Sequence, residues 1–347
     1  MARRKTPDSP PTGDGGLSPA LKLEMYRYLL LQRAVEDRAE KLYKGGHIHG
    51  GNFSGRGQEA ISVGTALALE PKDKIAPMIR NLGAVLIRGY TPKDIFSSFL
   101  AKATSPNGGK DNSTHFGEIP NRGVVACISM LGTLVPVMTG MALAAKLKRK
   151  PIVTLTYVGD GTTSTGEFHE GLNIAALYQV PFILIIENNQ FAYSTPVAKQ
   201  TTVRDLATKA AAYAIPYAIG DGNDVFEVYR LTKKFVDEAR AGGGPRVIEL
   251  KTLRMRGHAQ HDPADYVPKA LFEEWEKKDP IDRCEKALLD DGTLTEKKRD
   301  DLIAKIDAQV SEAEQFAINA PFPDPKEAVR GVFADDSIVP YTPWEER

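Results

Sequence analysis

Apolar side chains recur at helical spacing along the first part of the chain. The longest such pattern covers residues 19–43, with Ser18 as the capping residue and a pair of glycines after the last apolar position. Two further helices are expected over residues 58–69 and 92–102. The segment 134–147 is apolar nearly all round, which predicts a buried helix.

Short runs rich in β-branched residues alternate with helical patterns in the middle of the chain. The expected order is a strand at 152–158, a helix at 166–178, a strand at 182–187, a strand near Tyr217, a helix at 224–241 and a strand at 247–250. Strands that are apolar on both faces and bounded by glycine, proline or polar turns are typical of a parallel sheet. The alternation predicts an α/β fold, a mostly parallel sheet covered by helices on both faces, followed by C-terminal helices.

The sequence divides into three expected parts. Residues 1–17 are basic and then rich in Pro, Gly and Asp, which predicts a disordered tail; residues 18–268 carry the α/β pattern; residues 269–347 are charged and helical with a Pro-rich end. The tail lacks the apolar stretch of a secretory signal, and its acidic residues argue against a transit peptide. We therefore expect a cytoplasmic protein.

Composition narrows the possible partners. Lys plus Arg and Asp plus Glu both total 45, so the formal net charge is zero and gives no reason to expect nucleic acid or an anionic membrane as partner. No apolar run reaches membrane-spanning length. The two cysteines, Cys127 and Cys284, have no paired spacing, so neither a disulfide framework nor a cysteine-based zinc site is expected.

Two of the predicted strands end in residues suited to a metal-bound diphosphate. The first is followed by Gly-Asp-Gly-Thr at 159–162, and the second by Glu-Asn-Asn at 187–189. The carboxyl ends of parallel strands meet at one edge of a sheet, where ligands bind. The Asp160 carboxylate and the Asn189 amide oxygen suit Mg²⁺, and the glycines let the backbone approach a phosphate closely. The sequence therefore predicts a magnesium–diphosphate site.

Other interpretations of this segment fit less well. A P-loop would need a lysine where Glu167 stands, and a dinucleotide fingerprint would need a glycine where Ser164 stands. An isolated Gly-Asp-Gly is more often a tight turn after a buried strand. The surrounding strand–helix–strand unit and the paired asparagines 29 residues after Asp160 favour the diphosphate site instead.

The residues around this motif resemble a known family. The string GDGTTSTGEFHEGLNIAALYQVPFILIIENNQFAYSTP is similar to the alpha subunits of pyruvate and branched-chain 2-oxo acid dehydrogenases, which use thiamine diphosphate. The resemblance also takes in LYKGGHIHG, RGQEAISVG, IRNLGAVLIRGY and GGGPRVIELKTLRMRGHAQHD, and covers roughly residues 21–320. It implies the thiamine diphosphate-binding, transketolase-like form of the α/β fold.

The resemblance also implies roles for single residues. The magnesium ligands would be Asp160, Asn189 and the backbone carbonyl of Phe191, and the catalytic residues would be His258 and His115. The residues that bind the cofactor would be Arg80, Ser129, Leu131, Asp160, Gly161, Thr162, Asn189 and His258.

The chain departs from the family pattern near these residues, at Ala259, in the stretch 111–115, and at two positions beside the proposed phosphate-binding arginine and the loop tyrosine. The usual tyrosine before the phosphate-binding arginine is Ile79, and an arginine common after the loop tyrosine is Val267. Residues His258, His261 and Asp262 could instead be read as a metal cluster, although histidines on a loop near an anionic cofactor have a simpler role.

The implied reaction is the oxidative decarboxylation of a 2-oxo acid with acyl transfer to a lipoyl group, and the preferred substrate is pyruvate, with branched-chain 2-oxo acids second. A separate beta subunit would supply the glutamate that activates the cofactor, which implies a heterotetramer of two alpha and two beta chains. A lipoyl acyltransferase core would bind this assembly. The alternatives are an acetoin dehydrogenase alpha subunit and, from a different class, a non-catalytic scaffold subunit.

Overall fold

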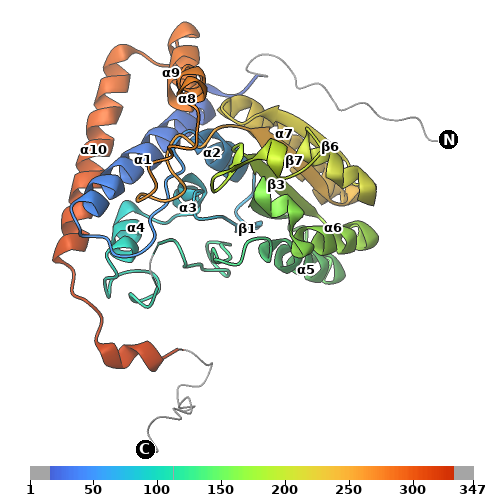
Figure 1. Ribbon diagram of the computed structural model, residues 1–347, viewed down its shortest axis with the longest axis horizontal. Helices are drawn as coiled ribbons and strands as arrows, with labels where there is room; N and C mark the ends of the chain where they lie inside the picture. The colour runs from blue at the N-terminus through green and yellow to red at the C-terminus, as the bar shows by residue number, and fades with distance from the viewer. Residues whose placement is uncertain (1–15, 112, 332–347) are drawn as a thin grey trace, which may run out of the picture.

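The computed structural model of the protein describes residues 16–111 and 113–331 (Figure 1). Most of the expected N-terminal tail and the end of the Pro-rich region, residues 332–347, lie outside the described ranges. Within those ranges, no helix combines the length and the apolar character that crossing a membrane requires.

A five-stranded parallel sheet forms the centre of the fold (Figure 1). Its strand order is β1-β2-β3-β7-β6, and every neighbouring pair is parallel. The bounds are β1 Lys74–Ala76, β2 Thr154–Gly159, β3 Phe182–Asn188, β6 Tyr217–Asp221 and β7 Arg246–Lys251. Two short strands, β4 Phe191–Ala192 and β5 Thr195–Pro196, form an antiparallel pair beside it.

Helices cover both faces of the sheet, as predicted. Successive side chains of β3 enter different cores: Ile183 and Ile185 pack with α1–α4 and α7, whereas Leu184 and Ile186 pack with α5 and α6. The α-helices are α1 Pro19–Lys44, α2 Glu59–Leu67, α3 Leu82–Ile87, α4 Pro92–Phe99, α5 Leu134–Leu147, α6 Gly166–Tyr178, α7 Val225–Glu238, α8 Lys269–Glu276, α9 Pro280–Asp290 and α10 Glu296–Asn319. Shorter 3₁₀ and π turns cover Gly161–Ser164, Val197–Lys199, Leu206–Tyr213, Ala239–Gly243 and Pro325–Val329.

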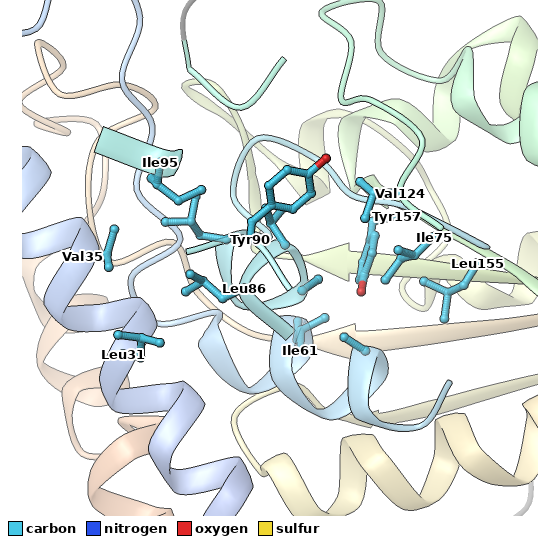
Figure 2. Close-up of a cluster of buried hydrophobic side chains, with 14 of the residues drawn as sticks. Leu31, Val35, Ile61, Ile75, Leu86, Tyr90, Ile95, Val124, Leu155 and Tyr157 are labelled. Carbon is cyan, nitrogen blue, oxygen red and sulfur yellow. The ribbon is translucent and has the colours of Figure 1, made fainter. Parts of the chain in front are cut away.

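The larger core lies between the sheet and helices α1 to α4 (Figure 2). Val35 of α1, Ile61 of α2 and Leu155 of β2 are fully buried there. Tyr157 of β2 is also buried, and its hydroxyl lies 2.6 Å from the Thr65 hydroxyl, so the polar group has a partner. Helix α10 packs against α1 and α4 and contributes to the same core. The division of the chain at residue 268 stays a prediction.

The prediction that helix α5 is buried all round is wrong for this chain. Val135, Met138 and Ala142 are fully buried, but Val137 is 40% and Leu147 is 75% exposed. The reason is that α5 lies in an outer layer, where only one of its sides meets α6 and the sheet. An apolar face is therefore left open on the surface of the chain.

Candidate active site

The carboxyl ends of β2 and β3 bring together two of the predicted metal ligands. The strands pair in parallel with Gly159 opposite Glu187, so the residues that follow each strand lie at the same edge of the sheet. The side-chain oxygen of Asn189 lies 3.1 Å from the carbonyl oxygen of Phe191 and 3.3 Å from the carboxylate Oδ1 of Asp160. The Asn189 oxygen therefore faces two other oxygens that act as acceptors.

Two arrangements relieve the repulsion between these oxygens. Adjacent ligands of an octahedral magnesium ion are about 2.9 Å apart, because each metal–oxygen bond is about 2.0–2.1 Å long. The separations in this structure are close to that value. Alternatively, a half-turn of the Asn189 amide would bring its nitrogen toward Asp160 and Phe191 as a hydrogen-bond donor. The cluster can therefore bind a cation, or its members can bind one another through hydrogen bonds from the turned Asn189 amide.

Each of the three oxygen-bearing groups has a partner outside the cluster. The Asp160 carboxylate, only 2% exposed, accepts a hydrogen bond at Oδ2 from Gln200 Nε2 at 2.7 Å. Burial raises the pKa of Asp160, and a cation would favour its charged form. The Asn189 nitrogen donates to Gln58 Oε1 at 3.1 Å, and Arg254 Nη1 donates to the carbonyl of Phe191 at 3.1 Å.

Gly161 and Thr162 begin a 3₁₀ turn that leads into helix α6. A Cβ atom at Gly161 would lie 2.6 Å from the Cβ of Ala192, so the close approach of the two segments requires glycine here. The loop that carries Leu131 lies beside this turn, since a Cβ at Gly132 would lie 3.5 Å from the Thr162 side chain. Leu131 itself is 59% exposed.

Arg80 and His258 form a second group. Arg80, only 6% exposed, donates from Nη1 to the carbonyl of Ser54 at 2.8 Å and from Nη2 to the carbonyl of His258 at 2.6 Å. The same Nη2 lies 3.4 Å from His258 Nδ1. The His258 ring packs against Tyr193 and Phe53, with ring centroids 4.6 and 5.6 Å away.

The electrostatics of this group keep His258 neutral. Burial, followed by the positive charges of Arg80 and Arg254, lowers the pKa of His258 to about 4. Burial also lowers the pKa of Arg80 to about 10, which leaves it charged at neutral pH. Glu187 and Glu36 oppose this lowering, and a buried guanidinium whose hydrogen bonds go to backbone carbonyls is suited to bind an anion such as a phosphate.

Hydrogen bonds connect the His258 loop to the oxygen cluster. The backbone nitrogen of His258 and the hydroxyl of Tyr266 both donate to Asp262 Oδ2, each at 2.6 Å. Arg254 Nη2 donates to the Tyr266 hydroxyl at 2.6 Å, and Arg254 also binds the Phe191 carbonyl. The alternative metal cluster at His258, His261 and Asp262 is not formed: the described ranges hold no group of three or more His, Cys, Asp or Glu side chains that could bind a metal ion.

A comparison with known proteins identifies the family. The family model described as "Dehydrogenase E1 component" matches residues 27–326. The chain belongs to this family. It is 37% identical over 322 residues to the 2-oxoisovalerate dehydrogenase subunit alpha of Bacillus subtilis, covering 92% of this chain and 97% of that protein. It is 32% identical over 311 residues to the pyruvate dehydrogenase E1 component subunit alpha of Rickettsia felis (90% and 95%) and 34% identical over 307 residues to that of Zymomonas mobilis (88% and 86%).

Family membership confirms three predictions: a 2-oxo acid dehydrogenase E1 alpha subunit, the α/β fold of that family, and an oxidoreductase. The E1 family uses thiamine diphosphate.

The remaining predicted site residues of this E1 alpha chain form a third group. His115 Nε2 lies 3.2 Å from the Ser129 hydroxyl, and His115 Nδ1 lies 3.1 Å from Asp111 Oδ2. Within the described ranges, no hydrogen bond joins this group directly to Arg80 or His258. The structure thus brings the predicted residues together in three groups around the edge of the sheet.

Several residues of the site were not predicted. Arg254 follows β7 and is only 2% exposed. It lies in a segment that resembles the family, but the sequence alone does not show that this arginine is buried at the end of a strand. Val267, which replaces a common arginine, packs in a small apolar cluster with Phe191, Leu253 and Ala264. Apolar packing therefore holds this end of the loop.

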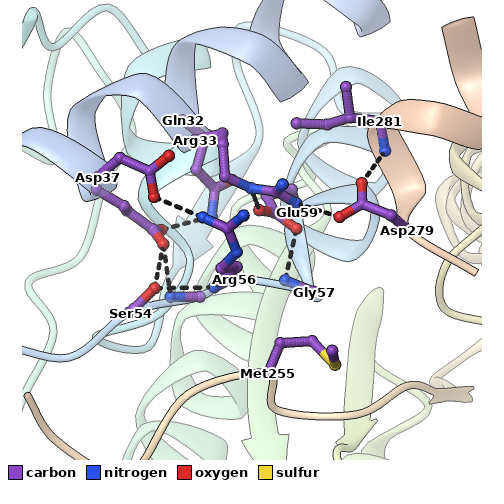
Figure 3. A network of polar contacts seen from close by, with 12 residues as sticks. Gln32, Arg33, Asp37, Ser54, Arg56, Gly57, Glu59, Met255, Asp279 and Ile281 are labelled. Atoms are coloured by element: carbon purple, nitrogen blue, oxygen red, sulfur yellow. Dashed lines mark hydrogen bonds and ion pairs between the residues drawn. The ribbon is translucent and has the colours of Figure 1, made fainter. Parts of the chain in front are cut away.

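A buried polar network lies behind the site (Figure 3). Arg33 of α1 forms ion pairs with Glu59 and Asp279. Glu36 accepts hydrogen bonds from the Ser54 hydroxyl at 2.7 Å and from the backbone nitrogen of Gly55 at 2.9 Å. Because Ser54 also binds Arg80 through its carbonyl, this network fixes the loop on which Arg80 rests.

Proposed function

We propose that this E1 alpha chain holds the diphosphate of thiamine diphosphate through Mg²⁺, with Asp160, Asn189 and the carbonyl of Phe191 as protein ligands. The observation that carries the proposal is that the Asn189 oxygen lies 3.1 Å from the Phe191 carbonyl oxygen and 3.3 Å from the Asp160 carboxylate. One carboxylate and two neutral oxygens suit Mg²⁺, whose other positions are commonly filled by phosphate oxygens and water. Arg80 would bind the same diphosphate.

The proposed reaction is the oxidative decarboxylation of a 2-oxo acid with acyl transfer to a lipoyl group. Bound thiamine diphosphate supplies the carbanion chemistry, and the protein supplies position and electrostatics. In a neutral His258 whose Nδ1 accepts from Arg80, the proton is on Nε2. That N–H would donate to negative charge developing on the substrate. His115, whose ring lies next to the Ser129 hydroxyl, would be the second catalytic residue.

The cofactor proposal is tested by calorimetry on the full chain with its beta partner. We expect thiamine diphosphate to bind only when Mg²⁺ is present, and Asp160→Ala to abolish that binding. An Asp301→Ala variant on the exposed side of α10 is the matched control and should bind as the unmodified protein does. Binding that does not depend on Mg²⁺ would contradict the proposed ligand set, and no binding at all would favour the scaffold alternative.

The substrate is proposed by class, with pyruvate first and branched-chain 2-oxo acids second. The relative from Bacillus subtilis is named for 2-oxoisovalerate, whereas the relatives from Rickettsia felis and Zymomonas mobilis are named for pyruvate. Steady-state rates with pyruvate, 2-oxoisovalerate and acetoin, measured with the beta partner present, would separate these candidates and the acetoin dehydrogenase alternative.

We also propose a beta subunit as partner, in an assembly of two alpha and two beta chains, with a lipoyl acyltransferase binding to it. The support is the open apolar face on α5, α6 and the loop before α5, formed by Met130, Leu131, Val137, Leu147, Ile174, Leu177 and Tyr178. Exposed large apolar side chains on two helices that pack against each other are typical of a surface that another protein covers.

The partner proposal predicts that Leu177→Ser weakens assembly. Leu177 is 73% exposed, so the substitution should leave the fold of the alpha chain intact. Ile303→Ser on α10 is the matched control, because Ile303 is also exposed (44%) but lies away from this face. Analytical ultracentrifugation of the alpha–beta mixture provides the measurement, and equal assembly of both variants would refute the assigned face.

A further inference from the structure

Two glutamines contact the side-chain metal ligands from outside the oxygen cluster. Gln58 precedes α2 and is fully buried, and Gln200 follows the short strand β5. We propose that Gln58 and Gln200 are positioning residues that determine which atoms of Asn189 and Asp160 face the metal ion. This inference rests on the proposed function and concerns residues that hold the ligands rather than the ligands themselves.

Gln58 determines the orientation of the Asn189 amide. Asn189 can present either its oxygen or its nitrogen to Asp160 and Phe191, and only the oxygen can bind a cation. In the structure, the Asn189 nitrogen donates to Gln58 Oε1 at 3.1 Å, which turns the amide oxygen inward. While Gln58 presents its oxygen, it favours the orientation of Asn189 that binds a metal, together with the Phe191 backbone N–H, which donates to the Asn189 oxygen at 3.4 Å.

The two amides are coupled. If Asn189 turned, its oxygen would face Gln58, which would have to turn as well and donate from its nitrogen. Gln58 Nε2 has no hydrogen-bond partner in the described ranges, although it is buried. Turning both amides would leave the Gln58 oxygen, instead of its nitrogen, without a partner, but it would let the Asn189 nitrogen donate to Phe191 and Asp160. The contacts of the Asn189 oxygen with two other acceptors therefore disfavour the metal-binding orientation in the absence of an ion, and an ion would favour it.

Gln200 acts in the same way on Asp160. Its nitrogen donates to Asp160 Oδ2 at 2.7 Å and to the carbonyl of Thr195 at 2.8 Å. With Oδ2 occupied, Oδ1 is the oxygen left for the cation, and it is the one that lies 3.3 Å from the Asn189 oxygen. Gln200 Oε1 is buried near Gly161 without a partner in the described ranges. It can accept a hydrogen bond from a water ligand, which Mg²⁺ usually retains.

Neither glutamine has another evident structural task. The Gln58 side chain does not cap α2, and its hydrogen bond to Asn189 is the one its side chain makes in the described ranges. The Gln200 side chain binds Asp160 and one carbonyl. Partners of metal ligands typically change metal affinity by 10–100-fold when they are substituted.

The test uses Mn²⁺ as a spectroscopic substitute for Mg²⁺, with thiamine diphosphate and the full chain bound to its beta partner. Electron paramagnetic resonance of free Mn²⁺ gives the dissociation constant without measuring activity. We expect Gln58→Met and Gln200→Met to weaken Mn²⁺ binding at least about tenfold. Gln58→Glu keeps an acceptor for the Asn189 nitrogen and should bind Mn²⁺ at least as tightly as the unmodified protein. Lys199→Met, at an exposed position beside Gln200, is the control.

The thermal unfolding midpoint in EDTA separates positioning from structural support. We expect the midpoints of Gln58→Met and Gln200→Met to stay within a few degrees of the unmodified protein. Unchanged Mn²⁺ affinity in both variants, or a loss of affinity that Gln58→Glu does not restore, would overturn the inference while leaving the proposed function intact. If the unmodified protein bound no Mn²⁺ with thiamine diphosphate, the proposed function itself would fail.

Discussion

The buried carboxyl of Glu187 makes the stability of this E1 alpha chain depend on pH. Glu187 is 0% exposed at the end of β3; one of its oxygens accepts from the Asn81 amide, and the other has no partner in the described ranges. Burial raises its pKa from 4.5 to about 7, against the opposing effects of Asn81 and Arg80. The folded state therefore retains a proton that the unfolded chain releases.

The sign and size of the effect follow from linkage. Between pH 4.5 and pH 7 the folded state binds more protons than the unfolded chain, so the free energy of unfolding falls as pH rises. A shift from 4.5 to about 7 corresponds to roughly 3.4 kcal/mol in total. Part of this stabilisation is already lost by pH 5, so the free energy of unfolding falls by about 2.5 kcal/mol between pH 5 and pH 8.

Glu187→Gln removes this titration and keeps an oxygen that can accept from Asn81. Urea unfolding at pH 5 and pH 8 should show the variant gaining about 2.5 kcal/mol on the unmodified protein over that range. Glu36, whose pKa burial also raises to about 7, titrates in both proteins and cancels. Glu273→Gln, at an exposed position of α8, is the control. If Glu187→Gln showed the same pH dependence as the unmodified protein, Glu187 would not hold the proton.

Three further outcomes are expected. NMR titration should place the pKa of His258 near 4, and Arg80→Gln should raise it while leaving it below 6.5, because burial is the larger cause; a value of 6.5 in the unmodified protein would contradict the site electrostatics. Gly57→Ala should destabilise more than Gly46→Ala: both glycines have positive φ, which costs about 1–2 kcal/mol, but only Gly57 has a backbone carbonyl 2.7 Å from the added methyl. Thr91→Ala removes the capping box of α4 and should lower the free energy of unfolding by about 1 kcal/mol, as urea curves would show.

The regular elements were predictable because their patterns are long. The predicted bounds of α5 and α6 agree with the structure to the residue, and the central strands agree within two residues. Strand β1 was missed because three residues, Lys74–Ala76, are too short to show a period. The burial of α5 was predicted wrongly, because periodicity reports that a face is apolar but not whether this chain or another covers it.

The candidate site was predictable only where it follows strand ends. Asp160 and Asn189 could be placed together because β2 and β3 are adjacent and parallel, so register alone fixes their proximity. Gln58, Gln200 and Arg254 reach the same cluster from positions 131, 40 and 63 residues away from the groups they bind. No local pattern records such contacts, since each depends on how loops return to the sheet edge.

The distribution of burial around the site indicates how it is completed. Asp160 and Arg80, the groups proposed to hold the diphosphate, are 2% and 6% exposed, whereas Leu131, proposed to line the cofactor, is 59% exposed. The diphosphate side of the site is thus buried and polar, whereas the side that carries Leu131 is exposed, as are apolar side chains of α5 and α6. Covering the seven exposed apolar side chains of these elements would remove apolar area from water, which favours a contact with another chain. A second chain that covered Leu131 would complete the site, which is why we expect catalysis from the assembly and cofactor binding alone from this chain.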